Sequence, residues 1–119
     1  MNINELRKEA IQKEMPIGTN EVTFAGIQYK VDENEDVKGV YVYTEEYRRV
    51  YLHFFNGEDG EPEVNPNLDY LLTQLGCETR SEEEANACKG TIIKAIKYAV
   101  AKEEKTYINV SFNPDFKVK

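Results

Sequence analysis

The sequence has few of the residues that catalytic and metal sites use. Its 119 residues include one histidine, His53, and two cysteines, Cys77 and Cys88, which are a poor ligand set for structural zinc. His53 has no candidate nucleophile nearby, and the acidic residues fall in solvated loops. No glycine-rich loop of the phosphate-binding kind is present. We therefore expect neither an enzyme nor a metal or cofactor site.

Long apolar runs are also missing. No segment reaches membrane-spanning length, and the N-terminus MNINELRKEA lacks the apolar core of a signal peptide. We expect a cytoplasmic protein without a membrane partner, in which both cysteines are reduced thiols. With 40% hydrophobic and 31% charged residues, residues 1–119 predict a single soluble domain.

Basic residues are fewer than acidic ones, but they are unevenly distributed. The net charge is −7, from 15 basic and 22 acidic side chains. Segments 37–57 and 89–119 together carry +5, whereas the remaining residues carry −12. Such a chain can bind a polyanion on one side and repel it on the other.

The segment from Val37 to Phe55 predicts a β-hairpin with two different faces. A five-residue loop over 44–48 pairs Val42 with Val50, Val40 with Leu52, Tyr41 with Tyr51, and Tyr43 with Arg49. One face is apolar, with Val40, Val42, Val50, Leu52 and Phe54. The other face carries Tyr41, Tyr43, Arg49, Tyr51, His53 and Phe55.

The second face has the chemistry of a nucleic-acid site. Bases stack on aromatic rings, and arginine both neutralises phosphates and stacks. The alternative is structural, because tyrosine favours strands in general and a second sheet layer or a subunit interface would also cover such a face.

Helix and strand signals organise the rest of the chain. Residues 1–15 predict a short amphipathic helix, and 21–31 predict a strand with a β-bulge at Ala25-Gly26. Asn65 and Gly76 are the expected caps of a helix that begins at Pro66, and its leucines are expected in the core. Ser81 and Glu84 form the pattern of a capping box for a second helical turn.

Residues 90–112 allow either a helix or a second hairpin, and we favour the hairpin because YINVSF alternates. A loop over 101–105 would pair Ile96 with Val110 and Tyr98 with Ile108 inside, and Lys97 with Asn109 and Ala99 with Tyr107 outside. Residues 113–119 form a short tail. The element order predicts a mainly β protein, a five-stranded OB-fold barrel with one helix between strands three and four.

Four stretches carry a resemblance to a known family: PIGTNEVTF, KGVYVYTEEYRRVYLHFF, NPNLDYLLTQLG and KGTIIKAIKYAVAKEEKTYINVSFNP. Together they span most of the chain from Pro16 to Pro114. The chain resembles the short single-stranded-DNA-binding proteins of tailed phages that infect Gram-positive bacteria. The acidic DENED loop differs from the family pattern, since it would repel phosphates.

The resemblance implies an OB-fold protein that coats single-stranded DNA in phage replication and recombination, in the host cytoplasm and without catalysis. It also implies a homo-oligomer, a dimer or tetramer, with replication or recombination proteins as further partners. The resemblance places the DNA contacts at Tyr41, Tyr43, Arg49, Tyr51 and His53. To these we add, as further expected contacts, the basic residues Arg48, Lys97 and Lys102 and the aromatic residues Phe55 and Tyr107.

The rival hypothesis is a small acidic interaction protein. A cluster of carboxylates can imitate nucleic acid and bind a host protein. Its surface would be formed by Glu58, Asp59, Glu61, Glu63, Glu82, Glu83 and Glu84.

Overall fold

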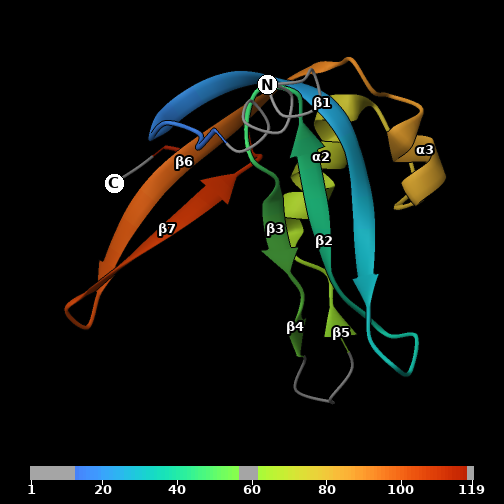
Figure 1. The fold of residues 1–119 in the computed structure, drawn as a ribbon, viewed down its shortest axis with the longest axis horizontal. Coiled ribbons are helices and arrows are strands. Elements are labelled where there is room, and N and C mark those ends of the chain that lie inside the picture. The colour runs from blue at the N-terminus through green and yellow to red at the C-terminus, as the bar shows by residue number, and fades with distance from the viewer. Residues whose placement is uncertain (1–12, 57–61, 118–119) are drawn as a thin grey trace, which may run out of the picture.

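The structure, a computed structural model, describes residues 13–56 and 62–117. It is mainly β, with an open, antiparallel five-stranded sheet in the order β3-β2-β1-β6-β7 and two short helices (Figure 1). The sheet strands are β1 (Gly18–Val31), β2 (Val37–Thr44), β3 (Val50–His53), β6 (Ile92–Lys102) and β7 (Lys105–Ser111). A separate two-stranded ribbon joins β4 (Phe55–Asn56) to β5 (Pro62–Glu63), and the helices are α2 (Pro66–Leu75) and α3 (Glu82–Asn86).

Strand β1 belongs to both halves of the sheet. Its first part, from Gly18 to Thr23, pairs with β6, and its second part pairs with β2. The register shifts between Phe24 and Gly26, which confirms the predicted bulge. Gly26 has φ 124°, and a Cβ there would lie 3.0 Å from the Asn86 side-chain oxygen. Glycine is therefore favoured at the bulge for its backbone angle, and a side chain there would also crowd Asn86.

The predicted register of the first hairpin is confirmed. Strands β2 and β3 pair Val40 with Leu52, Tyr41 with Tyr51 and Val42 with Val50. The expected pair of Tyr43 and Arg49 is not part of the ladder, because β3 begins at Val50. The apolar row faces the core, with Val50 partly buried and the others buried: Val40, Val42, Leu52 and Phe54.

The second hairpin forms as a hairpin, but its predicted register is wrong by one residue. Residues 92–102 are strand, and Ile96 pairs with Ser111 instead of Val110. The cause is the turn, which has two residues, Glu103 and Glu104, instead of five. Both have positive φ, 53° and 66°, as a tight type I′ turn requires. The other expected pairs, Lys97 with Asn109, Tyr98 with Ile108 and Ala99 with Tyr107, shift in the same way: Lys97 pairs with Val110, Tyr98 with Asn109, Ala99 with Ile108 and Val100 with Tyr107.

The expectation of a closed barrel is not met, because β3 and β7 are the two edges of an open sheet. The start of α2 takes up backbone groups that a β3–β7 ladder would use. Asn65 donates through Nδ2 to the His53 carbonyl oxygen of β3 at 3.0 Å. Asn67 donates to the Val110 carbonyl oxygen of β7 at 2.9 Å, and its side-chain oxygen accepts from the Phe112 amide at 3.1 Å.

The helix signals are confirmed for α2. The Asn65 side chain caps the Asn67 amide, Pro66 is the first helical residue, and Gly76 ends the helix at φ 78°. The leucines at 68, 71 and 72 are buried, and Leu75 packs partly against the core.

The second short helix, α3, also forms, and its side chains pair with the part of β1 that β6 does not reach. The Asn86 side-chain oxygen accepts from the Ile27 backbone N–H at 2.7 Å, and the Asn86 side-chain nitrogen donates to the Ile27 carbonyl oxygen at 3.2 Å, as a neighbouring strand would. Glu82 accepts from the Tyr29 amide at 3.0 Å. Ser81 caps the Glu84 amide, but the Glu84 carboxylate turns outside the expected box, toward the amides of residues 78 and 79.

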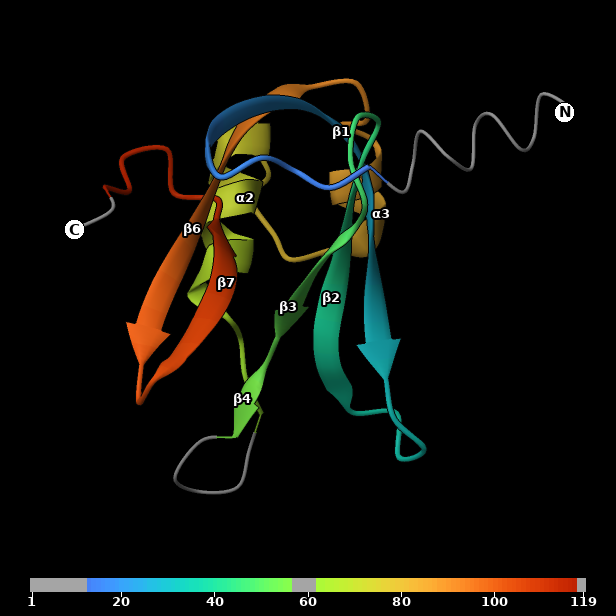
Figure 2. The same ribbon diagram turned by 60° about the vertical axis from the view of Figure 1, so that its left-hand side comes forward.

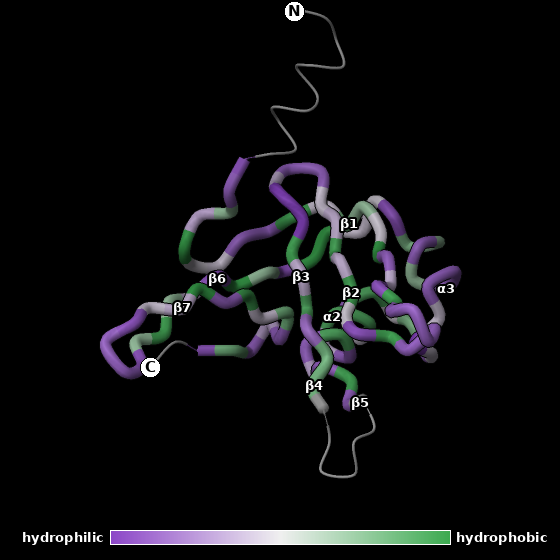
Figure 3. The backbone as a smooth tube through the Cα atoms, turned by 60° about the horizontal axis from the view of Figure 1, so that its bottom comes forward, coloured by the Kyte–Doolittle hydropathy of each residue, from purple (hydrophilic) through white to green (hydrophobic). Residues whose placement is uncertain are grey.

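The core lies between the bent sheet and α2. Figure 2 shows the β6–β7 hairpin and the β1–β2 pair on either side of α2, and Figure 3 shows α3 and the turn of the β6–β7 hairpin as hydrophilic. The largest fully buried side chains are Phe24, Phe112, Leu68, Leu71, Ile93, Val22, Val40 and Val42.

The expected N-terminal helix lies almost wholly outside the described residues. Of its residues, 13–15 are described, and they form an irregular segment. The described part of the tail, 113–117, folds back so that Phe116 packs on Tyr98 with ring centres 4.5 Å apart. Among the described residues, no helix is long and apolar enough to cross a membrane.

Candidate functional site

A row of aromatic rings crosses the outer face of β2 and β3. Tyr41 and Tyr51, which are paired across the two strands, have ring centres 4.9 Å apart. The row continues from Tyr51 to His53 at 6.2 Å and from His53 to Phe55 at 6.3 Å. Tyr51 and Phe55 are 38% and 51% exposed. We call Tyr41, Tyr51, His53 and Phe55 the aromatic row.

Two cations lie over this row. The Arg49 guanidinium carbon is 4.1 Å from the ring centre of Tyr41, and the Lys30 ammonium is 5.6 Å from that of Tyr51. Within the described ranges, neither Arg49 nor Lys30 forms an ion pair with a carboxylate. Their charges are therefore held against aromatic faces by cation–π attraction and stay available to an anion.

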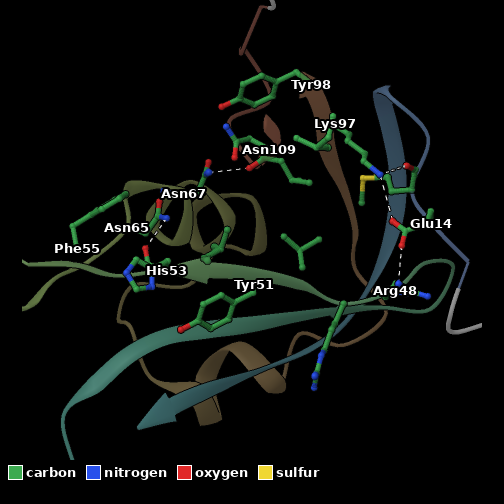
Figure 4. A pocket seen from close by; sticks show the side chains of 16 residues that line it. Glu14, Arg48, Tyr51, His53, Phe55, Asn65, Asn67, Lys97, Tyr98 and Asn109 are labelled. Carbon is green, nitrogen blue, oxygen red and sulfur yellow. Dashed lines mark hydrogen bonds and ion pairs between the residues drawn. The ribbon is translucent and has the colours of Figure 1, made fainter. Parts of the chain in front are cut away.

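A groove of about 640 Å³ runs between the edge strands β3 and β7, next to the aromatic row (Figure 4). Tyr51, His53 and Phe55 line it from the β3 side, so the groove and the row share side chains. Its remaining lining residues are Glu14, Met15, Arg48, Arg49, Val50, Leu52, Asn65, Asn67, Lys97, Tyr98, Ile108, Asn109 and Val110.

Polar contacts between distant segments border the groove at both ends. At one end, Asn65 and Asn67 at the start of α2 connect this helix to β3 and to β7 through the bonds described above. At the other end, Glu14 lies between two cations: its carboxylate is 2.9 Å from Arg48 and 3.5 Å from Lys97 (Figure 4). Lys97 also donates to the Met15 carbonyl oxygen at 2.8 Å.

The structure brings together part of the set that was expected to contact DNA. Tyr41, Arg49, Tyr51, His53 and Phe55 form one continuous surface. The other members lie elsewhere or are engaged: Tyr43 donates to the Gln28 side chain at 2.8 Å, Arg48 and Lys97 contact Glu14, and Lys102 and Tyr107 lie on the projecting β6–β7 hairpin.

Sequence reasoning missed Lys30, Asn65 as a bridge to β3, and Asn67. The signal for Lys30 was present, because the strand phase after the bulge places residues 28 and 30 on the outer face. What the pattern did not reveal is that β1 lies beside β2 with Lys30 opposite Gly39. The asparagine bridges leave no periodic signal, since each is one side-chain amide that bonds a distant backbone.

Two residues of the expected acidic surface form hydrogen bonds within the fold. Glu82 and Glu84 accept backbone hydrogen bonds, and those from the segment before α3 hold the pKa of Glu84 below its usual value. Residues 58–61 of that surface lie outside the described ranges. In the part of the chain that the structure describes, no group of three or more His, Cys, Asp or Glu residues is placed to hold a metal ion.

In comparisons with known proteins, the chain matches no protein-family model, no curated protein sequence and no solved structure.

Proposed function

We propose that this protein binds single-stranded DNA without sequence specificity, by stacking bases on the aromatic row. The observation that carries the proposal is the continuity of the row from Tyr41 to Phe55, with Arg49 stacked on Tyr41. Base–aromatic stacking contributes about 1–3 kcal/mol per base and tolerates any base. Duplex bases are already stacked on one another, so the site favours single strands.

The cations near the row limit how strongly binding depends on salt. Among the described residues, Arg49 and Lys30 pair with no carboxylate and can contact phosphates, whereas Arg48 and Lys97 share Glu14. When a DNA strand contacts these basic side chains, they neutralise about two to four of its phosphates. The affinity should therefore depend only weakly on salt concentration. The groove beside the row offers side-chain amides, from Asn109 for example, that can bond the edges of unstacked bases.

We further propose that the fold is an opened relative of the OB-fold. The strand order β3-β2-β1-β6-β7, with β1 shared between two halves, supports this proposal. In an OB-fold the ligand face is formed by the second and third strands. Here these strands are β2 and β3, which carry the aromatic row except for Phe55, the first residue of β4.

We also propose that the protein assembles into a dimer or tetramer. In this form it would act in phage DNA replication and recombination. Several sites on one long strand raise the overall affinity through effective concentration. Exposed apolar side chains on the β6–β7 hairpin offer contact area: Val100, Tyr107 and Ile108. We expect at least a dimer at micromolar concentration by light scattering, and a strict monomer with undiminished affinity for long strands would contradict this.

Chromatography on immobilised single-stranded DNA tests the function against the acidic-mimic hypothesis. A binder is retained at low salt and elutes as the salt concentration rises. A carboxylate mimic of nucleic acid is repelled by the column and flows through at every salt concentration.

A further inference from the structure

The two cysteines lie side by side although eleven positions separate them in the sequence. Cys77 follows Gly76, which ends α2, and Cys88 lies in the turn after α3. Their sulfur atoms are 3.9 Å apart, and both residues are half-buried against the core. The Cys88 sulfur also lies 3.7 Å from the Leu75 carbonyl oxygen and 3.6 Å from that of Glu84.

We propose that Cys77 and Cys88 form a reversible intramolecular disulfide when the protein meets a small-molecule disulfide such as oxidised glutathione. A disulfide needs a sulfur–sulfur distance of about 2.05 Å, so the two atoms must approach by about 1.9 Å. Both cysteines lie in turns that follow helices, where side-chain rotation does not break a sheet ladder. The thiol contacts that must be given up are weak hydrogen bonds.

The exchange balances in two steps. The Cys88 thiolate attacks one sulfur of oxidised glutathione, so that a mixed disulfide forms and the first glutathione leaves as its thiolate. The Cys77 sulfur then attacks the Cys88 sulfur and its proton passes to solvent, so that the second glutathione leaves. The protein loses two protons and two electrons, and one oxidised glutathione becomes two reduced ones.

The surroundings of the two thiols set the order of attack. Burial, together with the neighbouring Cys88, raises the pKa of Cys77 to about 11. Cys77 is thus almost wholly protonated near neutral pH and is a slow entering nucleophile. We assign the first attack to Cys88, and Cys77 then resolves the mixed disulfide that Cys88 carries.

The disulfide would tie α3 to the end of α2. Helix α3 supplies Asn86 and Glu82 as partners for the backbone of β1, so the bond would also hold the bulged half of β1 in place. Because the unfolded chain has more conformational freedom to lose than the folded one, closing this loop raises the stability of the domain.

In the test, the 119-residue protein is treated with a glutathione redox buffer, and its intact mass and free thiols are measured. With equal oxidised and reduced glutathione, we expect more than half of the monomer to lose two hydrogens and both thiols. We expect the melting temperature of the oxidised form to rise by roughly 5–10 °C, with reversal by a dithiol reductant.

Two single variants serve as matched controls. Cys77→Ser should keep one glutathione on Cys88 as a mixed disulfide, and Cys88→Ser should react several-fold more slowly with oxidised glutathione. The proposal would be overturned if the wild type carried two glutathiones, if it formed disulfide-linked dimers, or if both thiols stayed free. Because the wild type alone gives these outcomes, failure of a variant to fold does not rescue the proposal.

Discussion

The ring of Tyr51 lies across Gly39 of the neighbouring strand. Tyr51 pairs with Tyr41, so its side chain reaches diagonally over the strand toward Gly39 and donates to the Lys38 carbonyl oxygen at 3.3 Å. A Cβ at Gly39 would overlap the Tyr51 ring and would lie 2.7 Å from the Leu52 carbonyl oxygen. The absence of a side chain at Gly39 therefore leaves the space that the Tyr51 ring occupies.

Replacing Gly39 with alanine should displace Tyr51 and strain β3. We expect Gly39→Ala to lower the free energy of unfolding by about 1–3 kcal/mol, as overpacking does, and to weaken single-strand binding. Chemical denaturation and a binding titration measure the two effects. In the double variant with Tyr51→Ala, the part of the strain that comes from the ring should disappear. Fully additive losses of stability would show that the ring and Gly39 are not coupled.

Substitutions on the two faces of the first hairpin should separate binding from folding. Tyr51→Ala removes an exposed stacking ring, so it should weaken binding by about 1–3 kcal/mol and change stability by less than about 1 kcal/mol. Val42→Ala removes buried methyl groups on the opposite face and should lower stability by about 1–3 kcal/mol. At a temperature where Val42→Ala is folded, its affinity should be unchanged. If both variants lost stability and neither lost affinity, the face assignment would be wrong.

Asn67 should matter more than its position near the start of a helix suggests. Its side chain bonds both the Val110 carbonyl and the amide of buried Phe112. Asn67→Ala leaves these groups unpaired, so we expect a loss of about 1–3 kcal/mol in stability and faster hydrogen exchange at the Phe112 amide. Thr73→Ala is the control, because the Thr73 hydroxyl bonds only within α2 among the described residues. Equal effects of the two variants would contradict the bridging role.

The ion pair of Asp69 and Arg80 predicts a small pH dependence of stability. Two hydrogen bonds of 2.9 Å from Arg80 hold the pKa of Asp69 below its usual value. The contribution of this ion pair to stability is therefore complete above the pKa of Asp69 in the unfolded chain. It is lost as the pH falls through the pKa of Asp69 in the folded protein. Since both side chains are about half exposed, it amounts to at most about 1 kcal/mol.

The measurement compares Arg80→Met with the wild type by denaturation at pH 6 and again at pH 2. The difference in stability between the two proteins should be present at pH 6 and should shrink at pH 2. Lys94→Met is the matched control, because Lys94 forms no ion pair within the described ranges. If the loss of stability in Arg80→Met were the same at both pH values, the ion pair with Asp69 would not be its cause.

The sequence predicted the first hairpin well because its two faces differ in character. Val40 and Val42 alternate with Tyr41 and Tyr43, so one register places all the apolar residues of the row on the core face. The second hairpin has no such contrast, since Val100 and Ile108 are exposed although they are apolar. Its turn also places two glutamates, instead of asparagine or glycine, at positive φ. The one-residue error in register follows from these two facts.

The open barrel was beyond the reach of sequence patterns for a different reason. Strand order follows from the hydrophobic pattern and the element lengths, but closure depends on whether β3 and β7 bond each other. The side-chain amides of Asn65 and Asn67 take the relevant backbone groups. In the candidate site, alternation along the strands predicted the aromatic row. It could not predict that Arg48 and Lys97 pair with Glu14, because Glu14 is distant from both in the sequence.

Binding of labelled oligo-dT and of a duplex of equal length, followed by fluorescence anisotropy across a salt series, tests the central claim most directly. The account predicts a clear preference for the single strand. It also predicts a salt dependence that corresponds to about two to four phosphates, and loss of that preference in Tyr51→Ala. Equal affinity of the wild type for the single strand and the duplex, or no binding to either at low salt, would contradict it.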